Sequence, residues 1–96
     1  MNTRHAQLVL AVVREGGFTA AAKSLFITQP TLSQQIRQIE QQLGAPIFER
    51  KTTPVSLTPA GQIYVQAARR FLQIETQMNE SLAALSGHTA GLLRLG

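Results

Sequence analysis

The 96-residue chain contains no cysteine and no aspartate, and these two absences exclude several kinds of site. Without cysteine the chain has neither disulfides nor thiolate metal ligands, which fits a reducing compartment. Without aspartate, neither a Ser-His-Asp triad nor an aspartyl dyad can be assembled. The two histidines, His5 and His88, lie near opposite ends with no second ligand at helical spacing. We therefore expect no enzyme, no metal site and no cofactor in this stretch.

Long apolar runs and a phosphate-binding loop are also missing. The apolar run from Leu8 to Val13 is too short for a signal-peptide core or a membrane span. Gly16-Gly17 is not followed by the Gly-Lys-Ser/Thr sequence of a phosphate loop. We expect a cytoplasmic protein that has no membrane partner.

The positive charge lies in the front of the chain. The formal net charge is +4, and up to residue 70 eight basic side chains stand against three glutamates. The remaining tail is slightly acidic. This distribution favours a polyanion that contacts only the first part of the chain, although the excess is small enough to suit an ordinary solvated surface.

Two helices are predicted before residue 26. Ala6, Val9, Val12 and Val13 recur at helical spacing, which predicts a helix over about 4–15 that Gly16-Gly17 ends. Phe18 is expected in the core and Thr19 at the cap of a second helix. The inner face of that helix would consist of Ala21, Ala22 and Leu25.

A third helix is predicted after a turn at Phe26-Ile27. Thr28 is the expected cap, with Pro30 in the first turn, although Thr31 with Gln34 also reads as a capping box. Leu32, Ile36, Ile39 and Leu43 follow at steps of four, three and four, so they should share one buried face. Gly44 and Pro46 should end this helix.

The opposite face of the third helix carries amides and hydroxyls, which suits base reading. A glutamine amide matches the N6 and N7 edge of adenine, so Gln29 and Gln34 are the leading base readers. Pro30 and the Thr31 methyl group could meet a thymine methyl, while Arg37 could bind a phosphate or a guanine edge. The predicted DNA contacts on this helix are Thr28, Gln29, Pro30, Thr31, Ser33, Gln34 and Arg37.

A short hairpin should follow as a wing. Ile47-Phe48 and residues 55–57 are predicted as its two strands, joined through residues 51–54. Arg50, Lys51 and Thr52 near its tip are predicted to contact phosphates or the minor groove. The alternative is that they are ordinary surface residues of a hairpin.

Thr58-Pro59 should open a long helix that ends near residue 86. Apolar residues recur along it at steps of three and four, the spacing of a coiled-coil seam. Such a helix is longer than a small domain can cover, so a second copy of the chain is the expected partner. The predicted dimer interface consists of Tyr64, Ala67, Phe71, Ile74, Met78, Leu82 and Leu85.

Taken together, these features resemble the amino-terminal domain of the LysR-type transcriptional regulators. The resemblance is carried by Ala21-Ala22, Gln29-Pro30, Leu43-Gly44, Phe48, Arg50 and residues 57–61. It implies a bacterial transcription regulator in which the Gln29-Pro30 corner is set against the bases and the long helix forms a dimer. It also implies a missing C-terminal domain that binds a small-molecule effector, and possible tetramers of the full-length protein.

The predicted fold is mainly α: a winged helix-turn-helix of three helices and a two-stranded wing over 1–58, followed by a dimerisation helix over 59–86. Residues 87–96 are predicted as a hinge and the first strand of the missing effector domain. The expected function is sequence-specific binding of a homodimer to an inverted repeat in double-stranded DNA. The alternatives are a protein-interaction module and the DNA-binding domain of a molybdate-responsive regulator.

Overall fold

The computed structural model describes residues 1–88, which form four helices and one two-stranded antiparallel sheet. The predicted mainly α, winged helix-turn-helix fold is confirmed. The long helix continues two residues beyond the predicted end, and the remainder of the predicted hinge and strand, 89–96, lies outside the described residues. In chain order the elements are α1 Thr3–Glu15, α2 Phe18–Ser24, α3 Gln29–Leu43, β1 Phe48–Glu49, β2 Ser56–Leu57 and α4 Pro59–His88.

Helix α1 lies at the centre of the domain and is defined by both of its ends. The Asn2 side chain accepts a hydrogen bond of 2.7 Å from the His5 N–H and so caps the first turn. Gly16 ends the helix with a φ of 79°, the left-handed conformation that glycine adopts without strain. Between these ends Leu8, Val9 and Val12 are completely buried.

Helix α2 begins earlier than the sequence predicted. Gly17 precedes it in an extended conformation, and no side chain caps it. The predicted capping role of Thr19 is therefore wrong, because Thr19 already lies inside the first turn. The Ala21 N–H donates to the Gly17 carbonyl over 3.2 Å, so the backbone itself begins the helix.

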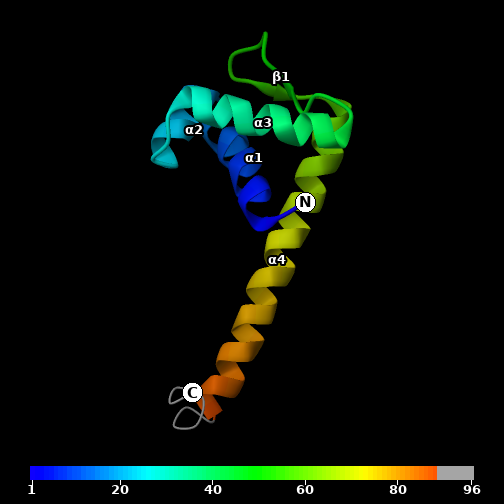
Figure 1. Cartoon of the computed structure of the whole chain (residues 1–96). Coiled ribbons are helices and arrows are strands. Elements are labelled where there is room, and N and C mark those ends of the chain that lie inside the picture. Colours follow the sequence, from blue (N-terminus) through cyan, green and yellow to red (C-terminus); the bar gives the residue numbers. More distant parts are fainter. Residues whose placement is uncertain (89–96) are drawn as a thin grey trace.

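The turn between α2 and α3 contains a non-glycine residue with a positive φ. Phe26 has a φ of 59° and is 94% exposed. The turn is closed by the Ile27 N–H, which donates to the Ala22 carbonyl over 3.0 Å. The two helices of the motif thereby meet at a fixed angle above α1, as Figure 1 shows.

Helix α3 starts where the favoured cap predicted. The Thr28 hydroxyl accepts from the Thr31 N–H over 3.3 Å, and Gly44 ends the helix with a φ of 83°. Leu32, Ile36 and Ile39 are buried as predicted, whereas Leu43 is 43% exposed. The prediction for Leu43 is wrong because this last residue of α3 borders an open hollow of about 130 Å³ beside α1 and α4.

The wing is bound to the start of α4. The Thr58 hydroxyl caps α4 by accepting from the Gly61 N–H over 2.9 Å, as predicted, and it also donates to the Pro46 carbonyl over 2.6 Å. The two strands pair Phe48 with Leu57 and Glu49 with Ser56, one residue beyond the predicted first strand. Helix α4 then runs past α1 and projects from the domain (Figure 1).

Helix α4 packs against its own domain from its start to about Glu75. Tyr64, Val65 and Ala68 are buried, and the Thr3 hydroxyl donates to the Glu75 carboxylate over 2.6 Å. Within residues 1–88, no helix combines the length and apolar character that crossing a membrane requires.

Candidate nucleic-acid interface

The residues predicted to read bases form one continuous surface on α3. Thr28, Gln29, Pro30, Thr31, Gln34 and Arg37 are all exposed, and Ser33 is half-buried. Leu32, Ile36 and Ile39, on the other side of the same helix, are buried against α1 and its neighbours. The amphipathic arrangement that the sequence predicted is therefore present, with amides and hydroxyls outward.

Several of these outward groups are held in place by bonds to one another. The Gln29 amide donates to the Ser33 hydroxyl over 2.7 Å, one turn along the helix. The Thr28 hydroxyl donates to the Thr31 hydroxyl over 2.8 Å. These exposed bonds orient the first turn of α3 and can be exchanged for bonds to a ligand, because each is accessible to solvent.

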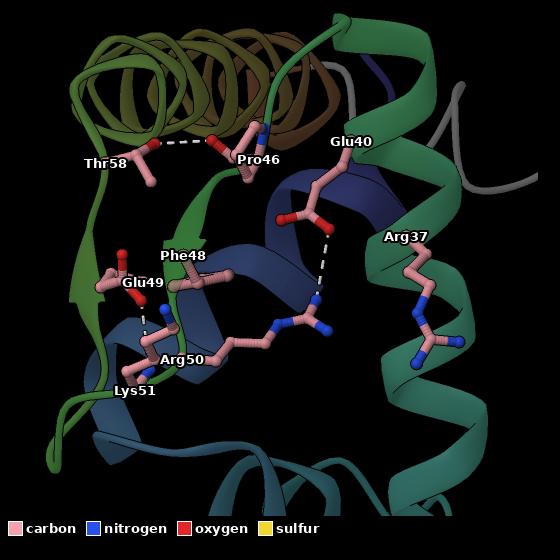
Figure 2. A pocket seen from close by; sticks show the side chains of 8 residues that line it. All are labelled: Arg37, Glu40, Pro46, Phe48, Glu49, Arg50, Lys51 and Thr58. Atoms are coloured by element: carbon pink, nitrogen blue, oxygen red, sulfur yellow. Dashed lines mark hydrogen bonds and ion pairs between the residues drawn. The ribbon is translucent and has the colours of Figure 1, made fainter.

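A second part of the surface lies between α3 and the wing. There an open hollow of about 500 Å³, called here the α3–wing hollow, separates the last turns of α3 from β1. Arg37 approaches it from α3, while Arg50 and Lys51 approach it from the wing (Figure 2). The full lining is Arg37, Glu40, Pro46, Phe48, Glu49, Arg50, Lys51 and Thr58.

The cations around this hollow differ in their surroundings. Within residues 1–88, Arg37 and Lys51 form no ion pair. In contrast, Arg50 Nη2 lies 3.2 Å from Glu40 Oε1, and the Arg50 guanidinium carbon lies 4.6 Å from the centre of the Phe18 ring. Arg37 and Lys51 are therefore available to a polyanion, whereas Arg50 is already engaged by two protein groups.

Glu40 is a residue for which the sequence predicted no role in the site. Its side chain is only 14% exposed, and both of its carboxylate oxygens are used. Oε2 accepts from the Ile47 N–H over 2.8 Å, and Oε1 accepts from Arg50. Its position on α3 gave no signal, because helical spacing does not reveal which polar residue will face a hairpin beyond the helix end.

The hydroxyl of Thr52, another predicted contact, takes part in folding the wing. It donates to the Glu49 carbonyl over 3.3 Å and accepts from the Ser56 N–H over 3.1 Å. The Lys51 N–H donates to the Glu49 carboxylate over 3.3 Å (Figure 2), and the Lys51 side chain is exposed.

The exposed apolar residues of α4 form a stripe that differs from the predicted seam at its start. Tyr64 is only 6% exposed and belongs to the core, whereas the neighbouring Ile63 is 72% exposed and was missed. Phe71 is half-buried against the core. Further along, the exposed large apolar residues are Ile74, Met78, Leu82 and Leu85.

Comparison with protein families and curated proteins gives a consistent result. The family model described as "Bacterial regulatory helix-turn-helix protein, lysR family" matches residues 3–62. The transcriptional activator CmpR of Synechocystis sp. is 39% identical over 93% of this chain, which spans 29% of that protein. The transcriptional regulator BudR of Klebsiella aerogenes is 38% identical over the whole chain, which spans 67% of that protein.

Comparison with solved structures extends this result to the fold. The crystal structure of the BenM_DBD/catB site 1 DNA complex superposes with a TM-score of 0.83 and 42% identity, covering 92% of this chain and 96% of that one. The CbnR_DBD-DNA complex gives a TM-score of 0.81 with 31% identity, covering 90% and 99%. These matches favour a LysR-type domain over the DNA-binding domain of a molybdate-responsive regulator. The chain belongs to the LysR family of bacterial regulators as a winged helix-turn-helix DNA-binding domain.

Proposed function

We propose that the chain reads double-stranded DNA with the exposed face of α3 in the major groove. The observation that carries the proposal is the division of α3 into a buried aliphatic side and an outward side of amides, hydroxyls and one arginine. Gln29 and Gln34 would bond to base edges, and Pro30 and Thr31 would contact thymine methyl groups. Thr28 and Ser33 would bond to bases or phosphates. The existence of DNA complexes of the similar BenM and CbnR domains supports this proposal.

The wing would contact the DNA backbone beside the major groove. Lys51 and Arg37 approach the α3–wing hollow from opposite sides and are unpaired within residues 1–88. A phosphate strand passing across this hollow would meet both cations, with Thr52 at the edge. Such contacts set affinity and register and carry little sequence information.

Dimerisation would use the outer stripe of α4. Ile63, Ala67, Ile74 and Met78 lie within about 60° of one another around the helix, on the side away from the buried Val65 and Ala68. Phe71, Leu82 and Leu85 extend the same surface. A homodimer would present two α3 helices to an inverted repeat, because symmetry in the protein requires symmetry in the site.

The longer protein would be a transcription regulator of the bacterial cytoplasm that responds to a small molecule. The chain spans less than a third of CmpR. In the longer protein, a further domain would hold the effector and could join dimers into tetramers. The domain described here would need no cofactor of its own.

A test of base reading starts with operators selected from random duplexes. Gln29→Ala should weaken operator binding by about 1–3 kcal/mol and leave binding to unrelated duplexes nearly unchanged, because only a base contact is lost. Gln73→Ala, an exposed glutamine of α4, is the control. Equal binding of every duplex, with no effect of Gln29→Ala, would contradict the proposal.

A separate test addresses the dimer. Ile74→Glu places a charge in the middle of the stripe and should shift the protein to monomers in sedimentation, while Gln73→Glu places the same charge beside the stripe and should not. If both variants sediment like the parent, α4 is not the dimer interface.

A further inference from the structure

We infer that Glu40 and Arg50 are positioning residues that fix the wing against α3, and that Arg50 is not a DNA contact. The inference rests on the proposed function for the role of the wing, but its structural basis is independent of DNA. The key observation is that a single carboxylate of α3 is bonded to the residue before strand β1 and to the residue after it.

The wing needs support from outside because its own sheet is very small. Only two residue pairs join β1 to β2, Phe48 with Leu57 and Glu49 with Ser56. A two-stranded hairpin of this size is not stable alone in water. Its position relative to α3 must therefore come from contacts with the rest of the domain.

Glu40 supplies such contacts at both ends of β1. Its Oε2 accepts from the N–H of Ile47, the residue before the strand, and its Oε1 accepts from the side chain of Arg50, the residue after it. The dashed line between Arg50 and Glu40 in Figure 2 shows the second bond, which joins the wing to α3. Because both oxygens are engaged, the carboxylate cannot turn toward solvent without releasing one end of the strand.

The other face of Arg50 is held by an aromatic pair. Its guanidinium lies over the Phe18 ring at 4.6 Å, a distance at which the cation is attracted to the ring. The Phe18 and Phe48 rings meet edge to face, with centres 5.5 Å apart. Phe18 therefore contacts both Phe48 of the strand and Arg50, the residue that follows it.

This arrangement separates the three cations of the α3–wing hollow into two roles. Arg37 and Lys51 are open to phosphate, while the charge of Arg50 is balanced by Glu40 and its guanidinium is covered on one face by Phe18. Arg50 would affect DNA binding through Lys51, because it keeps the wing in the position relative to α3 that brings Lys51 to the DNA backbone.

Glu40→Gln is the deciding variant because the two roles predict opposite effects on affinity. The amide oxygen can still accept from the Ile47 N–H, but the charge facing Arg50 is gone. If Arg50 were a phosphate contact restrained by Glu40, removing a negative charge would strengthen DNA binding. For positioning residues, binding weakens by about fivefold despite the more favourable net charge. Tighter binding overturns the inference, and so does unchanged binding if Lys51→Gln weakens the binding of the parent chain.

A cycle with Lys51→Gln locates the effect in the wing. Lys51→Gln should weaken binding by about fivefold in the parent chain but less than about twofold in the Glu40→Gln chain, where Lys51 no longer reaches the backbone. Gln29→Ala should cost the same in both backgrounds. If Lys51→Gln weakens binding in the parent chain and weakens it equally in the Glu40→Gln chain, the inference is overturned.

A measurement without DNA keeps the inference distinct from the proposed function. Limited trypsin digestion should cut after Lys51 several times faster in Glu40→Gln and in Arg50→Gln than in the parent, with cutting after Lys23 unchanged as the internal reference. Equal rates after Lys51 overturn the inference even if DNA binding is confirmed. Faster cutting after Lys51 with no effect of Lys51→Gln on affinity upholds the positioning of the wing and contradicts only its contact with DNA.

Discussion

Replacing Gly61 with alanine tests the junction on which the wing and α4 depend. A Cβ atom at Gly61 would lie 2.0 Å from the Ile47 carbonyl oxygen and 2.9 Å from the Ile47 carbonyl carbon. Both atoms belong to the backbone of a completely buried residue, so they cannot move aside as a flexible side chain would. The start of α4 must therefore shift by about 1 Å or more to restore ordinary van der Waals distances.

Opposing effects determine how far Gly61→Ala lowers the free energy of unfolding. Alanine gains about 1 kcal/mol over glycine inside a helix. The shift weakens the bond of 3.0 Å from the Thr58 N–H to the Ile47 carbonyl and the bond of 2.6 Å from the Thr58 hydroxyl to Pro46. At about 1 kcal/mol for each bond and about 1–3 kcal/mol for overpacking, the free energy of unfolding should fall by about 2–4 kcal/mol in total.

Thermal unfolding followed by circular dichroism measures this loss. A Tm lower by about 10–30 °C is expected for a domain of this size. Protein concentration must be held constant, since the proposed dimerisation would make Tm depend on it. Gly17→Ala is the control, because a Cβ there meets nothing within 4 Å. A Gly61→Ala protein that melts at or above the parent Tm would refute the reasoning.

Three further substitutions have expected outcomes. Phe26→Asn should raise the free energy of unfolding by about 1 kcal/mol in urea titrations, because asparagine tolerates the positive φ and the ring is 94% exposed; an unchanged or lower value would contradict this. Thr28→Ala should lower helix stability by about 1 kcal/mol through loss of the cap, measured in the same way, with Thr19→Ala as a control that lacks a capping bond. Burial raises the pKa of the Tyr64 hydroxyl above its ordinary value of about 10, so its contribution to stability is complete below about pH 10 and is lost as the pH rises through the folded-state pKa. Tyr64→Phe should remove this alkaline loss and, because no protein group within residues 1–88 satisfies the buried hydroxyl, should not destabilise the domain near neutral pH.

The fold could largely be predicted because most of its helices begin or end at residues whose effect is local. Gly16, Thr28, Gly44 and Thr58 each determine a helix end through their own backbone or hydroxyl geometry, and each lies where the sequence indicated. Thr19 misled because a threonine before a helical pattern indicates a cap even when an extended glycine already starts the helix. The sequence offers two neighbouring starts for this helix, and helical spacing does not decide between them.

The outward face of α3 could be predicted for the same reason that the core could. Once Leu32, Ile36 and Ile39 are buried, helical geometry places Gln34 and Arg37 outside. The bond between Glu40 and Arg50 could not be predicted, since it crosses the helix end at Gly44 and depends on where the hairpin folds back. Tyr64 and Ile63 were confused because both fit a pattern of threes and fours, and only the position of α1 decides which one is covered.

The bonded start of α4 constrains how chains of this kind can vary in length. Main-chain and carboxylate bonds join Thr58 to Ile47 and Ile47 to Glu40, so the axis of α4 keeps a fixed direction relative to α3. Each residue inserted after Phe71 would advance the rest of the helix by about 1.5 Å and turn it by about 100°. Insertions of about seven or eleven residues would return Met78 to its original side, whereas a single one would swing it away. Tolerated changes in the length of α4 should therefore come in steps of about seven or eleven residues. In the proposed dimer, the distance between the two α3 helices would then change in increments and not continuously.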